Sequence, residues 1–113
     1  MNARPTAELR RRRHAIWLDQ AKRCCWCGYH VKFSASTIEH LIPRSRGGSN
    51  EWCNLAVACG SCNHSRKDGR YPKRFTRERL AELVVDASQR AAARMSPMRM
   101  LGARAPTHEE ARP

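Results

Sequence analysis

Two pairs of cysteines with two-residue spacing are the feature that most constrains the fold of this 113-residue chain. Cys24 and Cys27 form the first pair, Cys59 and Cys62 form the second, and 31 residues lie between the pairs. Four thiolates with this spacing are typical of a tetrahedral structural zinc site, with Zn–S bonds of about 2.3 Å. The alternative is a set of buried free thiols or one redox-active dithiol. The spacing predicts Zn²⁺ bound by these four cysteines, with a folded segment inserted between the pairs.

Two further cysteines, Cys25 and Cys53, fall outside this paired spacing. Using Cys25 in place of Cys24 would shorten the first knuckle to C-x-C, which suits a zinc knuckle less well. We therefore expect Cys25 and Cys53 to be small buried hydrophobic residues. No apolar segment with a small-residue cleavage site follows the arginine-rich amino terminus, so we expect a cytoplasmic protein, in which disulfides seldom persist.

Positive charge is spread along the whole chain, which carries a net charge of +12. Residues 1–23 contribute +5, residues 24–75 contribute +5 and residues 76–113 contribute +2. A surface of this charge suits a polyanion, and no stretch approaches the roughly 18 apolar residues of a membrane helix. The four consecutive arginines at 10–13 are expected either to lie on a solvated helix face or to contact phosphates.

The sequence predicts three helical segments, two of them from hydrophobic spacing. Residues 7–23 contain neither proline nor glycine, and Thr6 is placed to cap them. Residues 63–68 are polar and compatible with a helix that Gly69 would end. The clearest helix covers residues 76–95, which carry one apolar stripe. The stripe consists of Leu80, Leu83, Val84, Ala87 and Ala91.

The segment between the cysteine pairs is predicted to contain strands, with residues 31–42 forming either two short strands or one interrupted strand. Residues 31–36 and 37–42 are rich in β-branched and apolar side chains. In residues 55–59 the larger side chains, Leu55, Val57 and Cys59, occupy every second position and would share one side of a strand. Pro43 stops strand pairing, and residues 44–50 form a loop by composition. Together these segments suggest a β-hairpin with a long, basic, glycine-containing loop.

Several short motifs between the cysteine pairs coincide with those of one known family. An acidic residue precedes His40, a proline follows three positions later, and Gly-Gly, Asn54-Leu55 and C-x-x-C-Asn come next. Over residues 24–68 the chain resembles the HNH endonuclease motif in its zinc-supported form. The resemblance implies an α+β fold, in which a small zinc-stabilised ββα-metal domain is flanked by helices. On this basis we expect a basic helical arm over residues 1–23, a nuclease domain with its C-terminal helix over 24–95 and a disordered tail over 96–113.

The resemblance implies a role for each matched residue. His40 matches the general base, and Asn54 matches the asparagine that fixes the hairpin loop and orients the histidine. Glu39 and Asn63 match the ligands of a catalytic divalent metal, at positions where the family more often has Asp and His. Their hard oxygen donors favour Mg²⁺ or Mn²⁺. His64 is an alternative donor, although on a helix it points about 100° away from its neighbour.

The chemistry of these residues agrees with phosphodiester hydrolysis, but their spacing raises a geometric difficulty. An imidazole titrates near neutrality and can accept a proton from water, while a divalent metal stabilises the growing negative charge. Neighbours on a regular strand, however, point to opposite faces. Glu39 and His40 would therefore reach one site only if the strand were bent or bulged near Pro43.

Basic residues flank the proposed site in sequence, and we expect them to contact phosphate groups rather than bases. They are Arg44, Arg46, Arg66 and Lys67. Nothing resembles a helix that reads base edges, so little sequence specificity is expected. Trp26, Trp52 and Tyr71 could stack on unpaired bases, but a core position is favoured in a chain with so few large apolar residues.

The expected function is metal-dependent cleavage of DNA, with RNA as an alternative substrate. Small HNH proteins that resemble this chain occur near phage packaging genes, where they assist the terminase, and others act as homing or restriction nucleases. Two other functions stay open. The chain could be a non-catalytic zinc-bound module that binds nucleic acid, or a small partner in a larger DNA-processing assembly. No membrane partner is expected.

Overall fold

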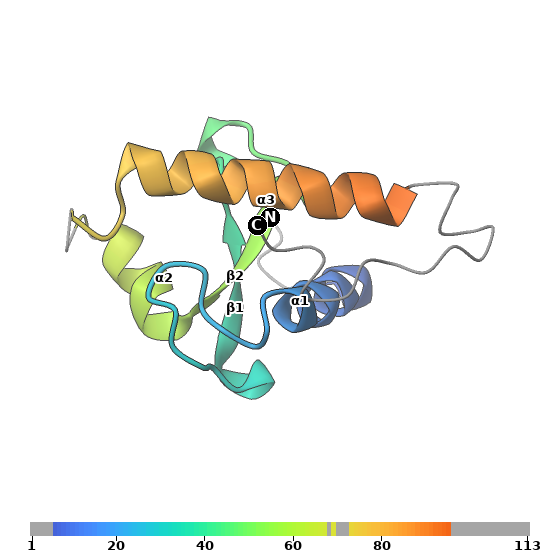
Figure 1. Ribbon diagram of the computed structural model, residues 1–113, viewed down its shortest axis with the longest axis horizontal. Coiled ribbons are helices and arrows are strands. Elements are labelled where there is room, and N and C mark those ends of the chain that lie inside the picture. Colours follow the sequence, from blue (N-terminus) through green and yellow to red (C-terminus); the bar gives the residue numbers. More distant parts are fainter. Residues whose placement is uncertain (1–5, 68, 70–72, 96–113) are drawn as a thin grey trace.

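A computed structural model describes residues 6–67, 69 and 73–95, in which a two-stranded antiparallel hairpin lies among three α-helices (Figure 1). The elements in chain order are α1 (Ala7–Asp19), η1 (Phe33–Ala35), β1 (Ser36–His40), η2 (Arg44–Arg46), η3 (Trp52–Asn54), β2 (Leu55–Cys59), α2 (Gly60–Lys67) and α3 (Arg77–Met95), where η marks a short 3₁₀-helix. This is the small α+β architecture expected from the sequence. The predicted tail over 96–113 lies outside the described residues.

Strand β2 is the centre of the fold because both of its faces are buried. Leu55 and Val57 point to one face, where they pack with Ile16 of α1. Ala56 and Ala58 point to the other face, which is covered by the cysteine cluster and by α3. Helices α1 and α2 therefore lie on opposite sides of the hairpin (Figure 1). The protein has two small apolar clusters on the two faces of one strand.

The two strands pair in a regular antiparallel register along their whole length. Glu39 lies opposite Ala56, and His40 lies opposite Leu55. Because directly opposed residues share a face of the sheet, Glu39 faces the cysteine cluster, whereas His40 faces the side on which α1 packs. The bend or bulge considered for this strand near Pro43 is not present within β1. Glu39 and His40 thus leave the strand on opposite faces.

Helix α1 is shorter than the helix expected over residues 7–23. Thr6 caps its start as predicted, since its hydroxyl oxygen accepts a hydrogen bond from the first turn. The helix ends at Asp19, and two residues of the following turn have left-handed φ values of 56° and 63°. This turn brings the Gln20 side chain to the edge of β2, where it accepts a hydrogen bond from the Val57 N–H and donates one to the Val57 carbonyl. The Gln20 side chain thus forms the hydrogen bonds that a third strand would otherwise form with Val57.

The expected strand over residues 31–36 is wrong, because this segment contains η1 and joins β1 only at Ser36. The guanidinium of Arg13 explains the difference. It donates hydrogen bonds to the Phe33 carbonyl at 2.9 Å and to the Ser36 carbonyl at 2.8 Å, and it lies 4.1 Å from the centre of the Phe33 ring. An arginine therefore satisfies carbonyls that a neighbouring strand would otherwise bind. Arg13 is half-buried, so the arginine block at 10–13 is not wholly solvated.

Asn54 closes the loop between β1 and β2. Its side-chain oxygen accepts a hydrogen bond from the Ile42 N–H at 2.8 Å. Its amide nitrogen donates to the Ile42 carbonyl at 3.1 Å and to the Ser49 carbonyl at 2.9 Å. Gly48 packs closely against the Ile42 carbonyl, because a Cβ atom at position 48 would lie only 1.7 Å from that carbonyl oxygen. These contacts fix the path of the chain directly after His40.

Helices α2 and α3 follow the sequence expectation with changed boundaries. Helix α2 begins at Gly60, earlier than the expected range 63–68, since it starts directly after the second strand. The Thr76 hydroxyl accepts a hydrogen bond from the first turn of α3 at 3.0 Å. Leu83 and Ala87 are buried, but Val84 is 38% exposed, so the apolar stripe is narrower than predicted. No helix among the described residues is long and apolar enough to cross a membrane.

Replacing Gly48 with alanine should destabilise the loop that follows His40. The new methyl group would collide with the Ile42 carbonyl, and overpacking of this kind typically costs about 1–3 kcal/mol. Gly60→Ala is the matched control, because a Cβ at that position meets nothing within 4 Å. Urea denaturation should place the midpoint of Gly48→Ala well below that of the wild type and leave Gly60→Ala close to it. Equal midpoints for the two variants would contradict the close packing of this loop.

Candidate functional site

The four paired cysteines form one cluster. Their Sγ atoms all lie within 4.8 Å of one another. Zn–S bonds of about 2.3 Å in a tetrahedron require sulfur–sulfur separations of about 3.8 Å, so the cluster has the size of a zinc site. The members are Cys24, Cys27, Cys59 and Cys62. Four thiolates fill a tetrahedral ion completely, so zinc held here would be structural.

Backbone N–H groups point at the sulfur atoms of this cluster. The N–H groups of Trp26 and Cys27 lie 3.3 and 3.4 Å from the Cys24 sulfur, and the Cys62 N–H lies 3.4 Å from the Cys59 sulfur. A hydrogen bond from the neighbouring Cys25 thiol, aided by backbone N–H groups, lowers the pKa of Cys24 to about 4. Burial raises the pKa of Cys62. A zinc ion would overcome this second effect, because a coordinated thiol is deprotonated.

The two remaining cysteines differ from each other in the structure. Cys25 is buried as expected, and its N–H donates to the Val57 carbonyl at 2.9 Å. Cys53 is exposed, so the prediction of burial is wrong for this residue. It lies in η3 between Trp52 and the buried Asn54. The turn of the 3₁₀-helix directs the flanking side chains inward and leaves Cys53 outside.

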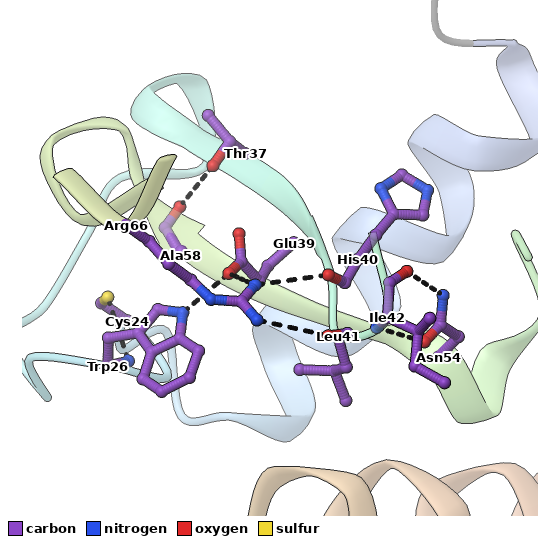
Figure 2. A network of polar contacts seen from close by, with 10 residues as sticks. All are labelled: Cys24, Trp26, Thr37, Glu39, His40, Leu41, Ile42, Asn54, Ala58 and Arg66. Atoms are coloured by element: carbon purple, nitrogen blue, oxygen red, sulfur yellow. Dashed lines mark hydrogen bonds and ion pairs between the residues drawn. The ribbon is translucent and has the colours of Figure 1, made fainter. Parts of the chain in front are cut away.

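Glu39 is a buried carboxylate with two strong partners. Only 2% of the residue is exposed. Its Oε2 atom accepts a hydrogen bond from the Trp26 indole N–H at 2.9 Å and forms an ion pair with the Arg66 guanidinium. Figure 2 shows the carboxylate turned toward these two groups, while the His40 ring points away from them. A cationic group therefore already lies where the sequence predicted a metal ion.

Arg66 connects this carboxylate to the end of β1. The guanidinium also donates to the carbonyls of His40 and Leu41, at 3.4 and 3.3 Å (Figure 2). Asn63 lies three residues earlier on α2, and residues with this spacing share one side of a helix. Asn63 is half-buried, whereas His64 is exposed. The two predicted ligands thus lie on one side of the hairpin, with Arg66 beside them.

The His40 imidazole is held by a residue that the sequence analysis did not single out. Its Nε2 atom lies 2.8 Å from the side-chain oxygen of Asn50. The Asn50 backbone carbonyl in turn accepts a hydrogen bond from Arg12 of α1 at 2.6 Å. Polar residues of a glycine-containing loop carry no spacing signal, so only the folded loop brings Asn50 to His40.

The predicted phosphate-binding residues fall into two groups. Arg44, Arg46 and Lys67 are exposed, whereas the Arg66 side chain is only 21% exposed and is bound to Glu39. The loop carrying the first two residues therefore presents charge to solvent directly beside the His40 end of the hairpin.

The described tryptophans are engaged within the protein. Trp26 is buried against Phe75, with ring centres 5.1 Å apart. Two guanidinium groups lie over the Trp52 ring, those of Arg12 at 5.3 Å and Arg94 at 4.3 Å from its centre. The core position that was favoured is confirmed for Trp26, whereas Trp52 is half-buried at the edge of the apolar cluster around Ile16. Tyr71 lies outside the described residues.

Comparison with known families identifies the region built around the hairpin. A family model described as HNH endonuclease matches residues 24–80, which is about half of the chain. The chain belongs to the HNH endonuclease family. The matched range contains the cysteine cluster, both strands, α2 and the start of α3.

A curated relative supports the same assignment. The HNH segment is 38% identical over 45 residues to the CRISPR-associated endonuclease Cas9 of Corynebacterium diphtheriae. This alignment covers 39% of the present chain and 4% of the Cas9 protein. The likeness therefore concerns the HNH segment alone.

Substituting Cys59 should release the metal and unfold the HNH domain. Structural zinc contributes folding free energy directly, so a cluster with three thiolates loses much of that stabilisation. Elemental analysis should find one zinc per wild-type chain and far less in Cys59→Ser, together with loss of the cooperative thermal transition. Cys53→Ser changes an exposed cysteine outside the cluster, so it should keep the zinc and the cooperative thermal transition. Iron in the purified protein, or an oxidised cluster that stays folded, would contradict structural zinc.

Proposed function

We propose that this HNH domain is a metal-dependent endonuclease that hydrolyses phosphodiester bonds of DNA. The observation that carries the proposal is the arrangement at the end of the hairpin. There, an oriented imidazole, a buried carboxylate bound to a cationic group and an exposed basic loop lie within a few residues of one another. The net charge of +12 favours a polyanionic substrate.

His40 acts as the general base in this proposal. It removes a proton from a water molecule whose oxygen attacks the phosphorus atom. The bond from phosphorus to one ester oxygen then breaks, and that oxygen takes up a proton. One product end keeps a phosphate that contains the water oxygen, and the other end is a hydroxyl. Only a neutral imidazole can accept the proton, so activity should rise with pH through the range in which histidine titrates.

The donor set fits a divalent ion, provided that Arg66 moves aside. Glu39 offers a carboxylate that already binds a cationic group, and Asn63 adds a neutral oxygen from α2. Hard oxygen donors of this kind suit Mg²⁺ or Mn²⁺. A divalent ion held by Glu39 and Asn63 would act as a Lewis acid toward the phosphate oxygens.

Phosphate contacts come from the exposed basic residues around the site. Arg44 and Arg46 lie in the loop next to His40, and Lys67 lies at the end of α2. Such groups bind the nucleic-acid backbone without reading sequence, so we propose low sequence specificity. A place in phage DNA packaging beside a terminase, or in homing or restriction, rests only on the resemblance to small HNH proteins.

A non-catalytic nucleic-acid-binding module is the second candidate function. The ion pair between Glu39 and Arg66 favours it, because a carboxylate that keeps its guanidinium does not bind a metal. In that case the zinc cluster and the basic surface would bind DNA without cleaving it. Metal-dependent nicking of plasmid DNA separates the two functions.

Removing the imidazole should abolish cleavage while the fold stays intact. His40→Ala should lose roughly 10²–10⁴-fold in the rate of plasmid nicking, which is the usual contribution of general base catalysis. His30→Ala is the control, since His30 is an exposed histidine away from the β1 end. Zinc content, thermal stability and DNA affinity should be unchanged in both variants. Nicking by His40→Ala at the wild-type rate, under the same metal and salt conditions, would refute this role.

Removing the Arg66 guanidinium should make the protein's stability depend on a divalent metal. Arg66→Met leaves Glu39 buried without its counter-charge, and breaking such a pair typically costs about 3–5 kcal/mol. If Mn²⁺ can replace the guanidinium, an excess of about 100-fold over its Kd should restore about 2.7 kcal/mol. Thermal unfolding with and without Mn²⁺ measures this difference.

The matched control for that experiment is the double variant Glu39→Gln with Arg66→Met. It removes both charges, so it should unfold at a temperature that Mn²⁺ barely changes. An Arg66→Met protein that responds to Mn²⁺ no more than the wild type would mean that Glu39 does not bind the ion.

A further inference from the structure

Among the residues that the structure describes, the His40 ring forms its hydrogen bond with the Asn50 side chain. Its Oδ1 atom lies 2.8 Å from Nε2, and Nη1 of Arg44 approaches the same oxygen at 3.4 Å. A guanidinium can only donate hydrogen bonds, so the approach of Arg44 identifies this atom as the oxygen of the amide. Because an amide oxygen only accepts hydrogen bonds, Nε2 must carry the proton of the neutral ring.

The backbone of Asn50 is fixed from the other side of the loop. Nη1 of Arg12 donates to the Asn50 carbonyl at 2.6 Å, and Nε of Arg12 donates to Glu8 at 2.9 Å. The same guanidinium lies over the ring of Trp52 at 5.3 Å. Through Arg12, helix α1 thus fixes the backbone of Asn50, whose side chain binds His40.

We propose that Asn50 is a positioning residue that orients His40 and keeps its proton on Nε2, so that Nδ1 is the atom that accepts the proton from water. This inference rests on the proposed nuclease function. A hydrogen bond to one ring nitrogen decides which nitrogen is free to act. An amide oxygen fixes the ring without placing a charge beside it.

Three variants separate positioning from a structural role. Asn50→Ala removes the acceptor and should lower kcat for plasmid nicking by roughly 10–100-fold, with KM nearly unchanged, because ring orientation is lost. Asn50→Asp keeps an acceptor but adds negative charge, so it should regain activity at higher pH and shift the pH–rate profile upward. Glu51→Gln, at the next position of the loop, should behave as the wild type.

A readout that does not require cleavage tests the contact itself. In nuclear magnetic resonance spectra of the zinc-loaded wild type, the Nε2–H proton of His40 should be visible, because a hydrogen bond slows its exchange with water. It should disappear in Asn50→Ala, while zinc content and melting temperature remain those of the wild type.

The outcomes distinguish this inference from the proposed function. If the Nε2–H signal depends on Asn50 but the wild type cleaves no DNA, the contact stands and the nuclease proposal fails. If the wild type cleaves DNA and Asn50→Ala cleaves it equally fast with an unchanged pH profile, the positioning role is overturned. Loss of activity in Asn50→Asp at every pH would likewise contradict it.

Discussion

The four-cysteine cluster joins the segments on which the candidate site depends. Its second pair lies where β2 ends and α2 begins, and α2 carries Asn63 and Arg66. Its first pair encloses Trp26. The two partners of the Glu39 carboxylate, the Trp26 indole and the Arg66 guanidinium, therefore come from the two knuckles that one zinc ion would hold together. If the cluster holds zinc, we expect loss of the ion to disturb both partners of this buried carboxylate.

The regular hairpin divides the candidate site between two faces. Glu39 lies on the side of the cysteine cluster, and His40 lies on the side of α1. The two sides meet at the end of β1, where the Arg66 guanidinium contacts both Glu39 and the His40 carbonyl. The strand alternation that was expected to separate Glu39 from His40 is therefore present, and Glu39 is buried. A site shared by the imidazole and the carboxylate belongs to the proposed function.

Local patterns in the sequence predicted a large part of this structure. The spacing of the cysteines reflects short-range geometry, and the structure confirms that the four side chains form one cluster. The strand over 55–59 and the α3 helix are present, but both faces of β2 are buried and the apolar stripe of α3 is narrower than predicted. The failures involve side chains whose partners lie elsewhere in the chain. Arg13 satisfies the carbonyls of a segment predicted as a strand, and Asn50 reaches His40 through a loop. Neither contact leaves a periodic signal in the sequence. The ion pair of Glu39 was missed for the same reason, since Arg66 lies 27 positions away.

The most direct test of the proposed site is to map where Mn²⁺ binds. Paramagnetic broadening should be recorded on isotope-labelled, zinc-loaded protein, because a bound Mn²⁺ ion broadens resonances close to it. The expected result is selective broadening of Glu39, of the Asn63 side-chain amide and of the His40 ring, with the helix α1 resonances much less affected. Broadening confined to the exposed carboxylates of α3, such as Glu82, or none at millimolar Mn²⁺, would contradict a catalytic metal site at the end of the hairpin.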